Sequence, residues 1–156
     1  NMKYKFFITT FLFVGIISST ETIKSIKLNK LHANPFSEAQ IVTLIASKDG
    51  FTIKEVSIEV PKERILKKLR LITDEDKYAV KVFGEDDKFL FSIGIGNPLY
   101  ATYEHIGYED RKYMGGPVSR ANIEIAIPMG VEATSFIISK RDISGKFNDL
   151  QELFLQ

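Results

Sequence analysis

The sequence predicts an all-β protein, an antiparallel β-sandwich of the immunoglobulin-like type with about seven strands. Short runs of alternating apolar and polar residues occur along most of the chain, for example at Tyr78–Val82 and Phe89–Ile95. Turn residues separate these runs, and helical spacing is confined to one segment. Because alternation gives each strand one apolar face, the strands are expected to pair into sheets that bury these faces against one another. A partly closed barrel is the alternative architecture.

The first predicted hairpin joins an apolar run at Ala39–Ala46 to a second strand over Phe51–Val60 through a Lys-Asp-Gly turn. The apolar residues of the second strand are odd-numbered up to Ile53 and even-numbered from Val56 onward. Such a change of phase indicates one extra residue, so we expect a β-bulge near residues 54–55.

Residues 61–72 are predicted to form a turn or a short helix, followed by a strand that opens at Leu69. Pro61 suits a first helical position. Ile65, Leu69 and Ile72 then recur at helical spacing. The apolar residues from Leu69 onward also fit the start of a strand, because they include a β-branched residue.

Stronger strand signals follow. The alternating runs on either side of the polar loop 84–88 predict an antiparallel hairpin. Ala121–Ile127 predicts another strand, which Pro128 ends. A closing hairpin is predicted from Phe136–Ser139 and Phe147–Leu155.

Residues 1–20 have the pattern of a bacterial secretory signal peptide. Two lysines precede an uncharged apolar run at Phe6–Ile17, and small residues follow it. The run is shorter than the roughly 20 apolar residues of a membrane span, so no stable span is predicted. We therefore expect a secreted or periplasmic protein, with a buried strand as the alternative structure for the run. Residues 21–38 are then an extended lead-in, and 39–156 form a single β-sandwich domain.

Composition excludes several classes of function. The chain of 156 residues contains no cysteine, which excludes disulfides, thiolate metal ligands and a cysteine nucleophile. Its 21 Lys and Arg residues balance 20 Asp and Glu residues, so no basic field suited to nucleic acid is present. No cofactor is predicted, because the Gly-x-Gly at Gly94 and Gly96 ends a strand instead of opening a helix.

The longest segment without periodicity, Leu99–Pro117, is the predicted binding site. Long irregular loops on compact domains are often functional, and tyrosine combines a large apolar ring with a polar tip. The alternative is that these rings only cover one open end of the sandwich. Five residues of the segment are candidates for contacts with a protein or glycan partner: Tyr100, Tyr103, His105, Tyr108 and Tyr113.

Catalysis has one candidate group, His105, which would serve as the general base of a small hydrolase beside Glu104 or Asp110. The sequence has no His-Glu-x-x-His and no Gly-x-Ser-x-Gly motif, so we predict a non-enzymatic protein without a catalytic or metal site. Two acidic clusters, 74–76 and 85–87, are predicted to be solvated turns, with a calcium site as the alternative. A third hypothesis is a structural subunit that adds an edge strand to a partner. The oligomeric state is left open.

The second half of the chain is similar in layout to the non-catalytic N-terminal β-sandwich domain of secreted IgA-peptidase-type metallopeptidases. The similarity covers about half of the chain and rests on these segments: Lys77–Phe83, Phe89–Gly96, Ile127–Met129, Ile137–Asp142 and Gly145–Phe147. The catalytic domain of that family has no counterpart here, so the resemblance implies no protease activity. It implies an exported accessory or adhesion-type module.

Overall fold

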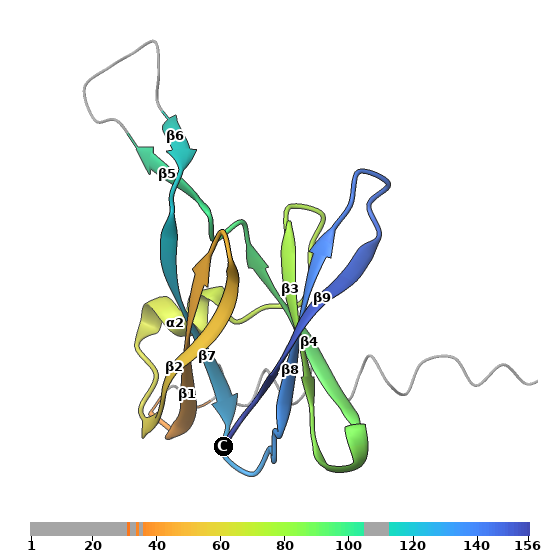
Figure 1. Ribbon diagram of the computed structural model, residues 1–156. Coiled ribbons are helices and arrows are strands. Elements are labelled where there is room, and N and C mark those ends of the chain that lie inside the picture. The colour runs from red at the N-terminus through yellow and green to blue at the C-terminus, as the bar shows by residue number, and fades with distance from the viewer. Residues whose placement is uncertain (1–30, 32–33, 35, 105–112) are drawn as a thin grey trace, which may run out of the picture.

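The computed structural model describes Leu31, Asn34 and residues 36–104 and 113–156 (Figure 1). The predicted signal peptide lies outside the described residues, and export stays a prediction. Leu31 is 2% exposed and belongs to the hydrophobic core, so the predicted lead-in supplies at least one core residue. Within the described ranges, no helix combines the length and the apolar character that a membrane span requires.

The described chain is mostly β, as predicted, and all of its strand pairs are antiparallel. Its elements follow one another in this order: β1 (Ala39–Ser47), β2 (Gly50–Glu59), α2 (Glu63–Lys68), β3 (Tyr78–Phe83), the 3-10 turn η1 (Glu85–Asp87), β4 (Phe89–Gly96), β5 (Tyr100–Glu104), β6 (Tyr113–Pro117), β7 (Arg120–Pro128), β8 (Ser135–Arg141) and β9 (Phe147–Phe154). Seven of the nine strands correspond to predicted ones. The other two, β5 and β6, form a hairpin in the segment predicted to be irregular.

Two sheets share one core (Figure 1). One has the strand order β2-β1-β7 and the other the order β4-β3-β8-β9, while β5 and β6 pair only with each other. The core draws on the inward faces of both sheets, with Leu44 and Ile125 from the first and Val80 and Phe136 from the second. Each of these side chains is at most 2% exposed, because alternate residues of each strand point inward.

The predicted β-bulge in the second strand is confirmed. Thr43 pairs with Glu55, whereas the next residue, Leu44, pairs with Ile53. Lys54 is therefore the extra residue of β2. Because one residue is skipped, Ile53 and Val56 lie on the same face of the sheet in spite of their odd spacing.

The predicted short helix is confirmed, but the strand predicted from Leu69 is wrong. Residues 69–77, called the connector below, contain no strand. Together with α2, the connector joins the end of β2 to the start of β3 at the opposite end of the molecule. β2 ends at Glu59 and β7 ends at Pro128, and both residues pair with Ala39 at the start of β1. β3 begins at Tyr78 beside Lys140, near the far end of β8. The segment is held to the end of β4 by a hydrogen bond from the Gly94 N–H to the Arg70 carbonyl at 3.2 Å, and it forms no strand ladder.

Gln151 joins the two sheets on the side formed by β2 and β9. Its side-chain amide donates to the carbonyl of Phe51 at 2.8 Å and accepts from the Phe51 N–H at 2.9 Å. Both backbone groups of an edge-strand residue are therefore satisfied by one side chain from the other sheet.

We expect Gln151→Leu to lower the free energy of unfolding by about 1–2 kcal/mol, because it leaves two partly buried backbone groups without partners. Urea denaturation measures this loss. Glu152→Leu, at an exposed position on the same strand, is the control and should change stability by less than about 0.5 kcal/mol. Equal losses in the two variants would contradict the bridging role.

Asp142 organises the turn between β8 and β9. Its carboxylate accepts hydrogen bonds from the hydroxyl and N–H of Ser144, the side-chain amide of Asn148 and the N–H of Lys146. These bonds, led by those from the Ser144 and Asn148 side chains, lower the pKa of Asp142 from 3.8 to about 2.

The low pKa of Asp142 predicts how the turn responds to acid. Because the folded pKa is below the unfolded one, the stabilisation is complete above pH 3.8 and is lost as the pH falls through about 2. Carboxyl-carbon NMR should give a midpoint of about 2 for Asp142. A midpoint near the ordinary value of 3.8 would show that the hydrogen bonds do not form in solution.

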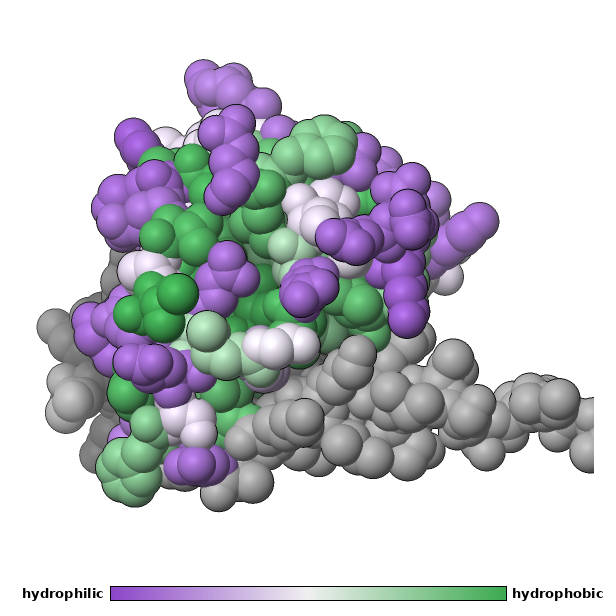
Figure 2. All heavy atoms as spheres, turned by 90° about the horizontal axis from the view of Figure 1, so that it is seen from below, coloured by the Kyte–Doolittle hydropathy of each residue, from purple (hydrophilic) through white to green (hydrophobic). Residues whose placement is uncertain are grey.

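Apolar side chains are exposed at the end of the molecule where β2, β7 and β9 finish. Figure 2 shows this end, with hydrophobic residues between hydrophilic ones. Ile58, Met129 and Phe154 are each more than half exposed. These exposed apolar side chains lie at the opposite end of the sheets from the β5–β6 hairpin (Figure 1).

Candidate functional site

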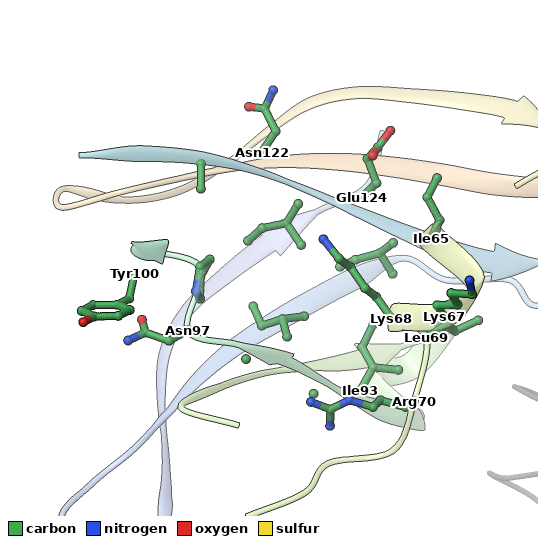
Figure 3. A pocket seen from close by; sticks show the side chains of 17 residues that line it. Ile65, Lys67, Lys68, Leu69, Arg70, Ile93, Asn97, Tyr100, Asn122 and Glu124 are labelled. Carbon is green, nitrogen blue, oxygen red and sulfur yellow. The ribbon is translucent and has the colours of Figure 1, made fainter. Parts of the chain in front are cut away.

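A pocket of about 450 Å³ opens between β4 and β7, the two strands that end their sheets on the same side of the molecule (Figure 3). Residues 97–100, which lead from β4 into β5, border it at one end. Residues 65–70, from α2 and the connector, border it at the other end. Its volume lies within the range of small-ligand sites.

The inner surface of the pocket is apolar. Ile93 is buried and Ile95 partly buried on β4, and Ile123 and Ile125 face them from β7. Ile123 and Ile125 alternate with outward-facing residues, so they share the inner face of the first sheet with Leu44. This surface can accept an apolar group.

Charge on the pocket wall comes from α2, the connector and β7. In Figure 3 the Lys68 side chain points into the pocket, whereas Glu124 lies on the other side of the β7 ribbon. The Glu124 carboxylate is bonded there to Arg64 at 2.5 Å. Arg70 is also neutralised, by Asp76 at 2.6 Å. Lys67, which also lines the pocket, pairs with Glu63 at 2.7 Å. Among the described side chains, Lys68 forms no salt bridge, so it is the one positive charge of the pocket wall without a carboxylate partner.

Asp76 fixes the connector against the end of β4. It is fully buried, and its carboxylate accepts two hydrogen bonds from Arg70, at 2.6 and 3.0 Å. It accepts two more from the N–H groups of Thr73, at 2.8 Å, and Gly96, at 2.7 Å. Arg141 of β8 donates to the Asp76 carbonyl at 2.8 Å. Together these bonds hold Arg70, a residue of the pocket wall, in place.

The ionised state of Asp76 is favoured in the fold. Burial raises the pKa of this carboxyl, but the hydrogen bonds from Arg70 and from the Thr73 and Gly96 N–H groups, together with the Arg70 charge, outweigh burial. Its pKa therefore lies below the ordinary value of 3.8. The prediction that the whole acidic cluster 74–76 is solvated is wrong for Asp76, because its carboxylate is buried and accepts hydrogen bonds from Arg70, Thr73 and Gly96.

Gly94 is required by this arrangement. A Cβ atom at Gly94 would overlap the Asp76 carboxylate, so only glycine lets the carboxylate approach the strand. The N–H of Gly94 also donates to the carbonyl of Arg70 at 3.2 Å. The Gly-x-Gly pattern at the end of β4 thus serves the contact with the connector.

The segment predicted as an irregular loop is partly a hairpin, which corrects that prediction. β5 pairs with β6 from Tyr100 opposite Pro117 to Glu104 opposite Tyr113. The hairpin projects beyond the sheets (Figure 1). Pairing between β5 and β6 satisfies the backbone N–H and C=O groups of this segment without a partner strand from either sheet.

The structure places the predicted site residues as follows. Tyr100 is 48% exposed and borders the pocket, with its ring packed over Gly115, where a Cβ would lie 2.6 Å from it. Tyr103 pairs with Met114 in the hairpin, and Tyr113, the first residue of β6, pairs with Glu104. His105 and Tyr108 lie outside the described residues, so the predicted general base is not placed.

Sequence reasoning missed Lys68, Asn97 and the four isoleucines as pocket residues. The isoleucines were correctly placed on strands, but sequence alone does not say which strands end the sheets. Lys68 lies in the segment predicted to form a turn or a short helix, and the helical spacing of its apolar residues was the available signal. Among the residues that the structure describes, no three His, Cys, Asp or Glu side chains come together in a group that could hold a metal ion.

Comparison with known proteins found no match: no family model, no curated protein and no solved structure is significantly similar to this chain. The resemblance to the IgA-peptidase-type domain therefore stays a prediction.

Proposed function

We propose that this protein is a non-enzymatic binding module that holds a protein partner at the pocket between β4 and β7 and at the base of the β5–β6 hairpin. The observation that carries the proposal is the apolar pocket of about 450 Å³ with Tyr100 exposed at its border. Buried apolar anchors and tyrosine contacts supply much of the affinity in protein interfaces.

The pocket favours a protein over a glycan. Its inner surface consists of isoleucine side chains, which match an apolar side chain better than a hydroxyl-rich sugar. The two strands that flank it also end their sheets, so a partner chain can lie along an edge. A partner bound at the pocket could therefore also pair with an edge strand, as the structural-subunit hypothesis proposes.

Hydrolysis has less support. The described residues that line the pocket include no Ser, Thr, Cys, His or Asp, so they offer no nucleophile paired with a base. The hydrolase hypothesis rests on His105 alone.

We further infer that the two sheets form an immunoglobulin-like sandwich. The order β4-β3-β8-β9 corresponds to C′-C-F-G of that fold, and β7 and β1 take the positions of E and B. The edge strand differs: β2 follows β1 in sequence, whereas strand A precedes B. The basic and apolar N-terminal pattern supports a secreted or periplasmic location.

Selection from a random linear-peptide phage library tests the binding proposal. The selected peptides, made synthetically, should contain an apolar residue and bind in the micromolar range. Ile123→Trp, which fills the pocket, should weaken binding at least about tenfold, as should Tyr100→Ala, which removes an exposed ring. Ile143→Trp, at a fully exposed turn position, is the matched control. Peptides that bind all four proteins equally, or a library that yields no binder, would contradict the proposal.

A further inference from the structure

Among the described residues, the pocket combines an apolar interior with one lysine, Lys68, that forms no salt bridge. Lys68 points into it (Figure 3), and its neighbours of opposite charge are already engaged, Glu124 with Arg64 and Asp76 with Arg70. An apolar group alone would leave this ammonium beside the ligand without a partner. An anion at the end of the apolar group would pair with it.

We propose that the occupant of this pocket is the C-terminal end of a peptide chain, whose last apolar side chain enters the isoleucine-lined interior while its carboxylate pairs with Lys68. This inference rests on the proposed function and specifies the part of the partner that is recognised.

The geometry explains why a chain end is favoured over an internal segment. The pocket is bordered at one end by Asn97, Pro98 and Tyr100 and at the other by α2, where Lys68 lies in the last turn. Lys68 is exposed, so its ammonium can pair with a carboxylate while the apolar group of the same ligand occupies the interior. A chain that continued past this point would meet the helix.

Polar groups around the pocket favour a peptide over a free fatty acid. Asn97 lines the pocket and lies beside Tyr100 in Figure 3. Side-chain amides hydrogen-bond both to N–H and to carbonyl groups, which a peptide backbone offers at every residue and an acyl chain does not. Decanoate has the same apolar carboxylate chemistry without these amides, and it serves to separate the two sources.

Calorimetric titration of the full-length chain tests the proposal with three probes: a pentapeptide that ends in leucine as the free acid, the same peptide as its C-terminal amide, and decanoate. We expect the free acid to bind about tenfold more tightly than the amide. Lys68→Gln should remove this difference by weakening only the acid. Lys62→Gln, the same change at an exposed position before the helix and away from the pocket, should preserve it.

The outcomes distinguish recognition of the carboxylate by Lys68 from binding at the pocket itself. If acid and amide bind equally to the wild type, or if Lys68→Gln keeps the preference for the acid, recognition of the carboxylate is contradicted while the binding module stands. If decanoate binds more tightly than the peptide acid, the peptide source is overturned. If Ile123→Trp leaves the affinity for every probe unchanged, the pocket is not the site and the proposed function fails with it.

Discussion

Asp76→Asn is expected to lower the free energy of unfolding by about 3 kcal/mol. The carboxylate is fully buried and accepts from Arg70 and from two backbone N–H groups. An asparagine of the same shape has one acceptor oxygen and turns its amide nitrogen, a donor, toward other donors. The Arg70 charge also loses its partner. Few single substitutions on exposed surfaces reach this magnitude.

Chemical denaturation at pH 7 measures this effect. Asp74→Asn, an exposed position two residues earlier, makes the same chemical change and should alter stability by less than about 0.5 kcal/mol. The contribution of Asp76 also has a defined pH dependence. Its folded pKa is lowered, so its stabilisation is complete above about 3.8 and is lost as the pH falls through the lower folded value. If both variants were equally stable, the described contacts would not be those of the folded protein.

Gly94→Ala is expected to be at least as disruptive, with a loss of about 3 kcal/mol or more, because the added methyl group overlaps the Asp76 carboxylate. Either the carboxylate or the strand must move, and each movement breaks hydrogen bonds of the connector. Since Arg70 lines the pocket, the substitution should also weaken peptide binding.

A double-mutant cycle isolates this overlap. In the Asp76→Ala background the carboxylate is absent, so adding Gly94→Ala should cost less than about 1 kcal/mol more. Gly116→Ala is the matched control: a Cβ there meets no atom within 4 Å, and its φ is not positive. Strict additivity of the Gly94 and Asp76 losses would show that the two residues do not meet.

Much of the fold could be predicted from local patterns. The seven main strands, the short helix and the bulge at Lys54 each depend on the order of a few neighbouring residues, through alternation, helical spacing or a change of phase. The hairpin β5–β6 was missed because it projects beyond the sheets and its residues do not alternate between apolar and polar.

The candidate site could be predicted only in part. Tyr100 was identified because it is one of several tyrosines in a long segment without periodicity. The pocket beside it depends on which strands end the two sheets, and this is decided by pairing between residues more than 80 positions apart, as in Thr43 with Glu124. The burial of Asp76 likewise depends on Gly96, 20 residues away. The residues next to Asp76 in the sequence do not indicate that Gly96 is its partner.

The central claim is that the pocket between β4 and β7 is a binding site, and isoleucine-methyl NMR of the full-length chain tests it most directly. Titration with the leucine-ending peptide acid should shift the methyl signals of Ile93, Ile95 and Ile123, while those of Ile58 and Ile143, both exposed elsewhere, stay in place. Shifts confined to Ile58 or Ile143, or no shifts at millimolar peptide, would contradict the account.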